Sequence, residues 1–67
     1  MQKYEVTEIY VNNPKTLLMT LDEVHRFTGA IARKFNCGLI RRWSQDGYDY
    51  YDCGPRSFKV RAVKISD

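Results

Sequence analysis

The chain has 67 residues, of which 43% are hydrophobic and 28% are charged, and its formal net charge is +3 at pH 7. A chain this short has apolar residues for only one core, so we expect a single domain with little room for a deep enzyme cleft. No segment approaches the ~18 apolar residues of a membrane span, and the first residues lack the apolar run of a secretion signal. We therefore expect a cytoplasmic protein that makes no contact with a membrane.

The basic residues concentrate in the second half of the chain. Residues 1–32 carry one more acidic than basic residue, whereas residues 33–67 carry eight basic residues against four acidic ones. A basic half favours an anionic partner, such as nucleic acid or an acidic protein surface, although the same charge also serves solubility.

Metal binding and catalysis are disfavoured by the residues available. Cys37, Cys53 and the single His25 are a poor set for zinc, which requires four ligands at close spacing. Without a secretion signal, we expect two reduced, buried thiols rather than a disulfide. Asp49 and Asp52 are better explained as partners of arginine and tyrosine, and there is no Gly-rich phosphate loop or nucleophile elbow. We therefore predict a protein without cofactor, metal or enzymatic activity.

The first predicted elements are two strands. Residues 4–11 are rich in β-branched and aromatic side chains, which favours a strand, and the turn Asn12-Asn13-Pro14 then reverses the chain. Residues 16–19 can return as a second strand. A four-residue loop would place Ile9 near Leu18 and Val11 near Thr16.

A helix is predicted from about Leu21 to about Phe35. Thr20 followed by Glu23 forms a capping box, and Met19 with Val24 forms a hydrophobic staple. One apolar face follows at helical spacing, and Asn36 or Gly38 can supply a left-handed cap. The members of the apolar face are Leu21, Val24, Thr28, Ile31 and Phe35, flanked by Phe27 and Ala32.

Three further strands are predicted after the helix. Residues 39–44 and 48–53 flank Asp46-Gly47, a dipeptide typical of two-residue hairpin turns. This turn sets Trp43 opposite Tyr50, Arg41 opposite Asp52, Arg42 opposite Tyr51 and Ile40 opposite Cys53. A last strand over residues 57–65 changes its hydrophobic phase near Ala62, which indicates a bulge or an edge there. The fold class is therefore α+β: one amphipathic helix on an antiparallel sheet of four to five strands, in the order ββαβββ.

Only one face of the 39–53 hairpin can meet the helix. Burying Leu39, Trp43 and Tyr50 removes the larger apolar area from water, so we expect Arg42, Asp49 and Tyr51 to be exposed. Tyrosine and arginine are enriched where proteins bind one another, and basic and aromatic side chains together also bind nucleic acids.

The predicted function is that of a small non-catalytic binding protein. The first hypothesis is a protein-binding inhibitor or accessory factor, of a size seen among phage and mobile-element products, that docks through a Tyr/Arg surface. The alternative is DNA or RNA binding by the basic half. A homodimer through an edge strand is a further hypothesis. The candidate binding residues are Arg33, Lys34, Arg42, Tyr51, Arg56, Lys59 and Arg61.

One segment offers a different arrangement. MTLDEVHRFTG at residues 19–29 resembles the opening helix of MerR-type or excisionase-type winged-helix proteins, and IRRW at residues 40–43 is similar to the end of their second helix. This resemblance implies a recognition helix over residues 31–43 and a wing over residues 48–60. Arg33, Lys34, Arg41 and Arg42 would then face DNA.

Overall fold

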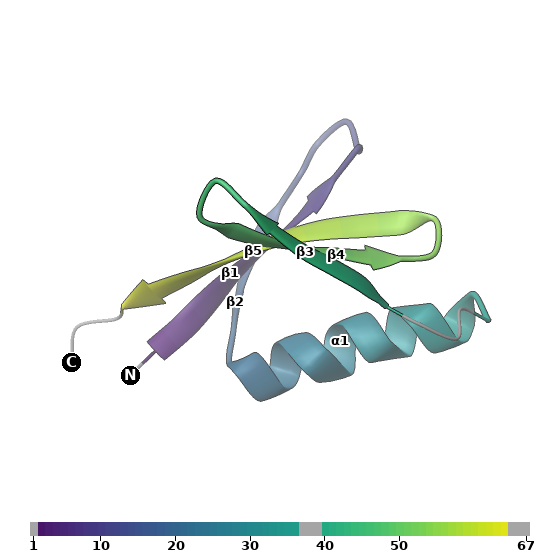
Figure 1. Ribbon diagram of the computed structural model, residues 1–67, viewed down its shortest axis with the longest axis horizontal. Coiled ribbons are helices and arrows are strands. Elements are labelled where there is room, and N and C mark those ends of the chain that lie inside the picture. The colour runs from purple at the N-terminus through teal and green to yellow at the C-terminus, as the bar shows by residue number, and fades with distance from the viewer. Residues whose placement is uncertain (1, 37–39, 65–67) are drawn as a thin grey trace.

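The computed structural model describes residues 2–36 and 40–64, which form five strands and one helix (Figure 1). Expectations that rest on Cys37, Gly38, Leu39 and Ile65 lie outside these residues. The elements in chain order are β1 (Gln2–Ile9), β2 (Thr16–Met19), α1 (Leu21–Lys34), β3 (Arg41–Gln45), β4 (Tyr48–Cys53) and β5 (Arg56–Lys64). This order confirms the predicted ββαβββ arrangement.

All strand pairs are antiparallel, and the sheet order is β2-β1-β5-β4-β3. The last strand therefore lies in the centre of the sheet, between the first strand and β4. Figure 1 shows α1 along one side of the sheet, with the strands fanning out across it. We call the other side, which no element of the described chain covers, the open face.

Helix α1 begins as the sequence predicted. The backbone N–H of Thr20 donates to Glu23 Oε1 at 2.8 Å, and the Thr20 hydroxyl accepts from the Glu23 N–H at 3.2 Å. These bonds satisfy two amides that the first turn of a helix cannot pair internally. At the other end, Asn36 adopts the left-handed conformation with φ of 56°, which confirms the predicted cap.

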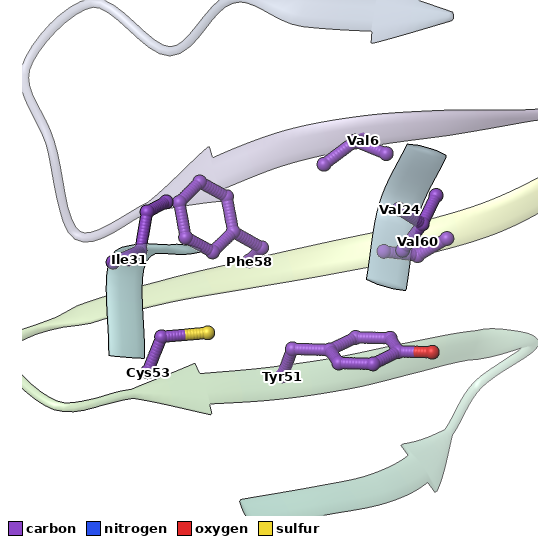
Figure 2. Packing of buried hydrophobic residues seen from close by; sticks show 7 residues of the cluster. All are labelled: Val6, Val24, Ile31, Tyr51, Cys53, Phe58 and Val60. Atoms are coloured by element: carbon purple, nitrogen blue, oxygen red, sulfur yellow. The ribbon is translucent and has the colours of Figure 1, made fainter. Parts of the chain in front are cut away.

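The core lies between α1 and the facing side of β1, β4 and β5. Figure 2 shows Ile31 beside Phe58 and Cys53, and Val24 beside Val60. Thr28 is fully buried, and its hydroxyl donates to the Val24 carbonyl at 2.9 Å, so no buried donor is left unpaired there. The buried hydrophobic residues of the core cluster are Val6, Val24, Ile31, Tyr51, Cys53, Phe58 and Val60.

The register of the first hairpin differs from the prediction. Thr7 pairs with Thr16, and Glu5 pairs with Leu18, so the predicted pairing of Ile9 with Leu18 is wrong. The turn is longer than expected because β1 ends at Ile9 and Tyr10 already takes a left-handed conformation, with φ of 64°. Since the shift is an even number of residues, the side chains still lie on the same faces as in the predicted pairing.

The second hairpin has the predicted register. Arg41, Arg42 and Trp43 pair with Asp52, Tyr51 and Tyr50, and both turn residues, Asp46 and Gly47, have positive φ values. Of the bulge or edge expected near Ala62, the structure has the edge: β5 pairs with β1 without interruption from Ser57 to Lys64, whereas its pairing with β4 reaches only Val60. Ala62 is exposed. Because this end of β5 is not buried, apolar and polar residues need not alternate there, which accounts for the change of hydrophobic phase.

Candidate functional site

The open face holds an unusual group of aromatic side chains. Strand residues alternate between the two faces of a sheet, and Tyr51 and Cys53 point toward α1. Tyr48 and Tyr50 of β4 therefore lie on the open face, and Trp43 of β3, which pairs with Tyr50, lies there too. We call Trp43, Tyr48 and Tyr50 the aromatic ladder.

The rings of the aromatic ladder contact one another across and along the strands. Trp43 and Tyr50 stack with ring centroids 5.3 Å apart and an interplanar angle of 9°. Tyr48 lies 6.3 Å from Tyr50 in a tilted arrangement. Trp43 is 38% exposed, so the ladder offers aromatic surface to solvent on a sheet face that no described element covers.

Two cations of β5 lie against the ladder. The Lys59 ammonium is 4.8 Å from the centroid of the Tyr48 ring, and the Arg61 guanidinium is 5.6 Å from the same ring. Arg61 also donates from Nε to Glu5 Oε1 at 3.1 Å, and this hydrogen bond raises the pKa of Arg61. Within the described chain Lys59 has no carboxylate partner. Its charge is therefore available to an anionic group.

The net charge of the open face around the ladder is positive. Among residues 2–36 and 40–64, the carboxylates of this face are Glu5, which is held by Arg61, and Asp52, which accepts a 2.8 Å hydrogen bond from the Ser57 hydroxyl. Arg41 and Lys59 add cations on the same face. Because opposite charges across an interface steer partners together, this face is suited to an acidic surface.

Of the predicted binding residues, only Lys59 and Arg61 lie on the open face. The expected exposure of Tyr51 is wrong: its side chain belongs to the core and is 4% exposed. Burial raises the pKa of Tyr51, because the low-polarity surroundings disfavour phenolate.

Arg42 lies beside Tyr51, on the α1 side of the sheet. Its guanidinium is 5.6 Å from the Tyr51 ring and donates to Asp49 Oδ2 at 3.1 Å. The Ser44 hydroxyl also donates to Asp49 at 2.6 Å, and these two hydrogen bonds lower the pKa of Asp49. Arg42 is thus engaged in a local network at the end of the hairpin rather than grouped with Lys59 and Arg61.

The remaining candidates are spread over other surfaces. Arg56 is paired with Glu8 on the α1 side of the sheet. Arg33 is exposed on α1, and Lys34 lies 5.9 Å from the Phe35 ring. The seven predicted residues therefore do not form one site.

The sequence carried a signal for the aromatic ladder. The two faces of the 39–53 hairpin have charges at different distances from the turn: Arg42 and Asp49 lie close to it, whereas Arg41 and Asp52 lie farther away. Burying the Trp43 face would have turned Asp52, the neighbour of the fully buried Cys53, toward α1, at a large desolvation cost. Considering charge position as well as apolar area would have predicted the observed face.

The winged-helix arrangement is wrong for this chain. Helix α1 ends at Lys34, and Arg41–Gln45 forms a strand rather than the end of a recognition helix. Arg33 and Arg41 consequently belong to different elements and do not share a DNA-facing helix.

Comparison with known proteins gives no assignment. No protein-family model matches the sequence, and no curated protein or solved structure matches it. In residues 2–36 and 40–64 there is no helix with the length and apolar character of a membrane span. No group of three or more His, Cys, Asp or Glu side chains in those residues could hold a metal ion.

Proposed function

We propose that this chain is a non-catalytic protein-binding module that docks on an acidic partner surface through the open face. The observation that supports the proposal is the aromatic ladder on a sheet face without a covering layer, with Lys59 and Arg61 against it. Trp, Tyr and Arg dominate binding energy at protein interfaces because they combine large contact area with polar reach. A small chain that covers part of a partner's surface through its open face could act as an inhibitor or an accessory factor of that partner.

The ring geometry favours a protein over a single-stranded nucleic acid. A base binds an aromatic side chain by stacking on a free ring face. Trp43 and Tyr50 stack on each other, and Lys59 and Arg61 lie against Tyr48. Fewer ring faces are then available to bases, whereas ring edges and tyrosine hydroxyls can contact protein side chains.

A capture experiment with paired variants tests the proposal. The tagged chain would be used to isolate partners from a lysate of its source cells, beside Trp43→Ala and the helix variant Arg33→Ala, and the partner would then be purified for titration calorimetry. We expect Trp43→Ala to weaken binding about thirty-fold, since a central tryptophan contributes about 2 kcal/mol or more. Arg33→Ala should bind as the unmodified chain does. Equal binding by the Trp43 variant would contradict the proposal.

Nucleic-acid binding is the second candidate, because the cations Arg41, Lys59 and Arg61 share the open face. Fluorescence anisotropy with labelled single-stranded DNA, duplex DNA and RNA, at roughly 50 and 200 mM salt, would detect it as an affinity that falls steeply with salt. Such binding, if it is also lost in Lys59→Glu, would replace the protein-partner proposal. No binding at the lower salt would exclude this candidate.

A further inference from the structure

A cleft on the α1 side of the sheet lies apart from the open face. Helix α1 starts after Met19, which pairs with Tyr4 of β1. Farther along the helix, Ile31 lies beside Cys53 of β4 (Figure 2). One corner of the sheet, near the β1–β2 turn and the start of β5, lies beside the helix rather than under it. There the cleft has a volume of about 280 Å³.

The walls of the cleft are mainly apolar. Leu17, Phe27 and Phe58 line it, and the Phe27 and Phe58 rings meet edge to face with centroids 5.2 Å apart. Leu17 is 50% exposed, although it lies on the sheet face that the helix covers elsewhere. A cavity of about 150 Å³ holds benzene in another protein, so the volume here suits a ligand with one or two aromatic rings.

The polar groups of the cleft carry a net positive charge. Arg56 donates from Nε and Nη2 to the two oxygens of Glu8, at 2.9 and 2.7 Å. This bidentate pair neutralises the carboxylate and fixes the guanidinium, which lies 5.3 Å from the Phe58 ring centroid. Lys15 also lines the cleft, is exposed, and has no carboxylate partner among the described residues. An anionic group on a ligand would therefore be attracted, and a cationic group repelled.

We propose that this cleft binds a small aromatic carboxylate. Its rings would pack on Val11, Leu17 and Phe27, which keep exposed apolar surface, and its carboxylate would face Lys15 and the outer edge of Arg56. A few placed polar groups on a mainly apolar concave surface are typical of small-ligand sites. The site is separate from the partner surface proposed above, because its strand residues lie on the α1 side of the sheet and its other residues lie in the β1–β2 turn and on α1.

Three probes that share one ring system test the charge preference. Indole-3-acetate, neutral indole-3-acetamide and cationic tryptamine would each be titrated into the isotopically labelled protein and followed by two-dimensional amide NMR. We expect indole-3-acetate to shift the amide signals of Leu17, Phe27 and Phe58 in a saturable manner, with an affinity at least about tenfold higher than the other two probes. Equal affinities, or shifts centred on the open face, would overturn the proposal.

Substitutions at exposed lining positions test the location without disturbing the core. Lys15→Glu should weaken indole-3-acetate binding about tenfold and should remove the preference over tryptamine. Val11→Trp should fill the cleft and abolish binding, whereas Tyr10→Trp should not, because Tyr10 is 87% exposed and does not line the cleft. Unchanged binding by the Val11 variant, or an equal loss in the Tyr10 control, would place the ligand elsewhere.

Discussion

Tyr51 and Trp43 occupy neighbouring strands, but their rings lie on opposite faces of the sheet and have different roles. The Tyr51 ring packs among the core residues, with the Arg42 guanidinium beside it. The Trp43 ring stacks on Tyr50 at the surface. The first side chain therefore contributes mainly to stability, and the second is available for binding.

This difference predicts unequal costs of truncation. Tyr51→Ala should lower the free energy of unfolding by about 3–5 kcal/mol, because it leaves a cavity in the core. Trp43→Ala should cost about 1 kcal/mol, which is the order of an exposed aromatic pair. Urea unfolding followed by far-UV circular dichroism would measure both. An equal or larger loss in the Trp43 variant would contradict the assignment of the two faces.

Glu8 couples the stability of the fold to acidity. The hydrogen bond from Arg56 holds the pKa of Glu8 below its usual value. A carboxyl group whose pKa is lower in the folded state than in the unfolded state stabilises the fold at pH values above its unfolded-state pKa. This stabilisation is lost as the pH falls through the folded-state pKa.

Glu8→Gln should therefore reduce the loss of stability on acidification between about pH 5 and pH 3. Thermal unfolding across this range would measure the effect. Asp22→Asn is the matched control, because the Asp22–Arg26 pair is largely solvent-exposed and contributes little. If both variants retained the full acid dependence of the unmodified chain, Glu8 would not be its source.

At the level of elements, local signals predicted the helix and the second hairpin. Thr20 and Glu23 specify the start of α1 through contacts three residues apart, and Asp46-Gly47 specifies the register of β3 and β4. The first hairpin lacks such a signal: its six-residue turn contains a left-handed tyrosine, a conformation that a non-glycine residue rarely adopts. Its register was therefore the part that sequence patterns predicted wrongly.

The capping box should contribute measurably to stability. Thr20→Ala removes the side-chain oxygen that accepts from the Glu23 N–H, and we expect a loss of about 1 kcal/mol in the free energy of unfolding. Thr20→Ser keeps a hydroxyl oxygen and should stay close to the unmodified chain. Urea unfolding of the two variants would show this difference, and equal losses would indicate that the cap is not the cause.

At the scale of the whole molecule, the sheet order depends on contacts between distant parts of the chain. Residues of β5 pair with β1 along its whole length, from Gln2 with Lys64 to Ile9 with Ser57. No local sequence pattern specifies that β5 pairs with β1. The alternating apolar and polar residues of β5 would be compatible with any antiparallel neighbour. The candidate site depends on such contacts only in part: Trp43, Tyr48 and Lys59 lie on consecutive strands joined by short turns, but the side of the sheet on which α1 packs determines whether their face stays open.

This topology predicts slower folding than that of a helical protein of similar length. Sheets dominated by distant pairings typically fold in about milliseconds to seconds, because the chain must close long loops before those contacts form. Stopped-flow refolding can use the fluorescence of Trp43, the single tryptophan. A dominant phase in the microsecond range would contradict the expected dependence on the β1–β5 pair.

The central position of β5 also determines when the protein can fold during its synthesis. Until β5 has left the ribosome, the β1–β2 hairpin and the β3–β4 hairpin have no strand to join them, because β5 is the neighbour of both β1 and β4. The apolar face of α1 lacks Phe58 and Val60 during that interval. The nascent chain therefore exposes core side chains until β5 has emerged, and in this interval chaperones have their main opportunity to bind it.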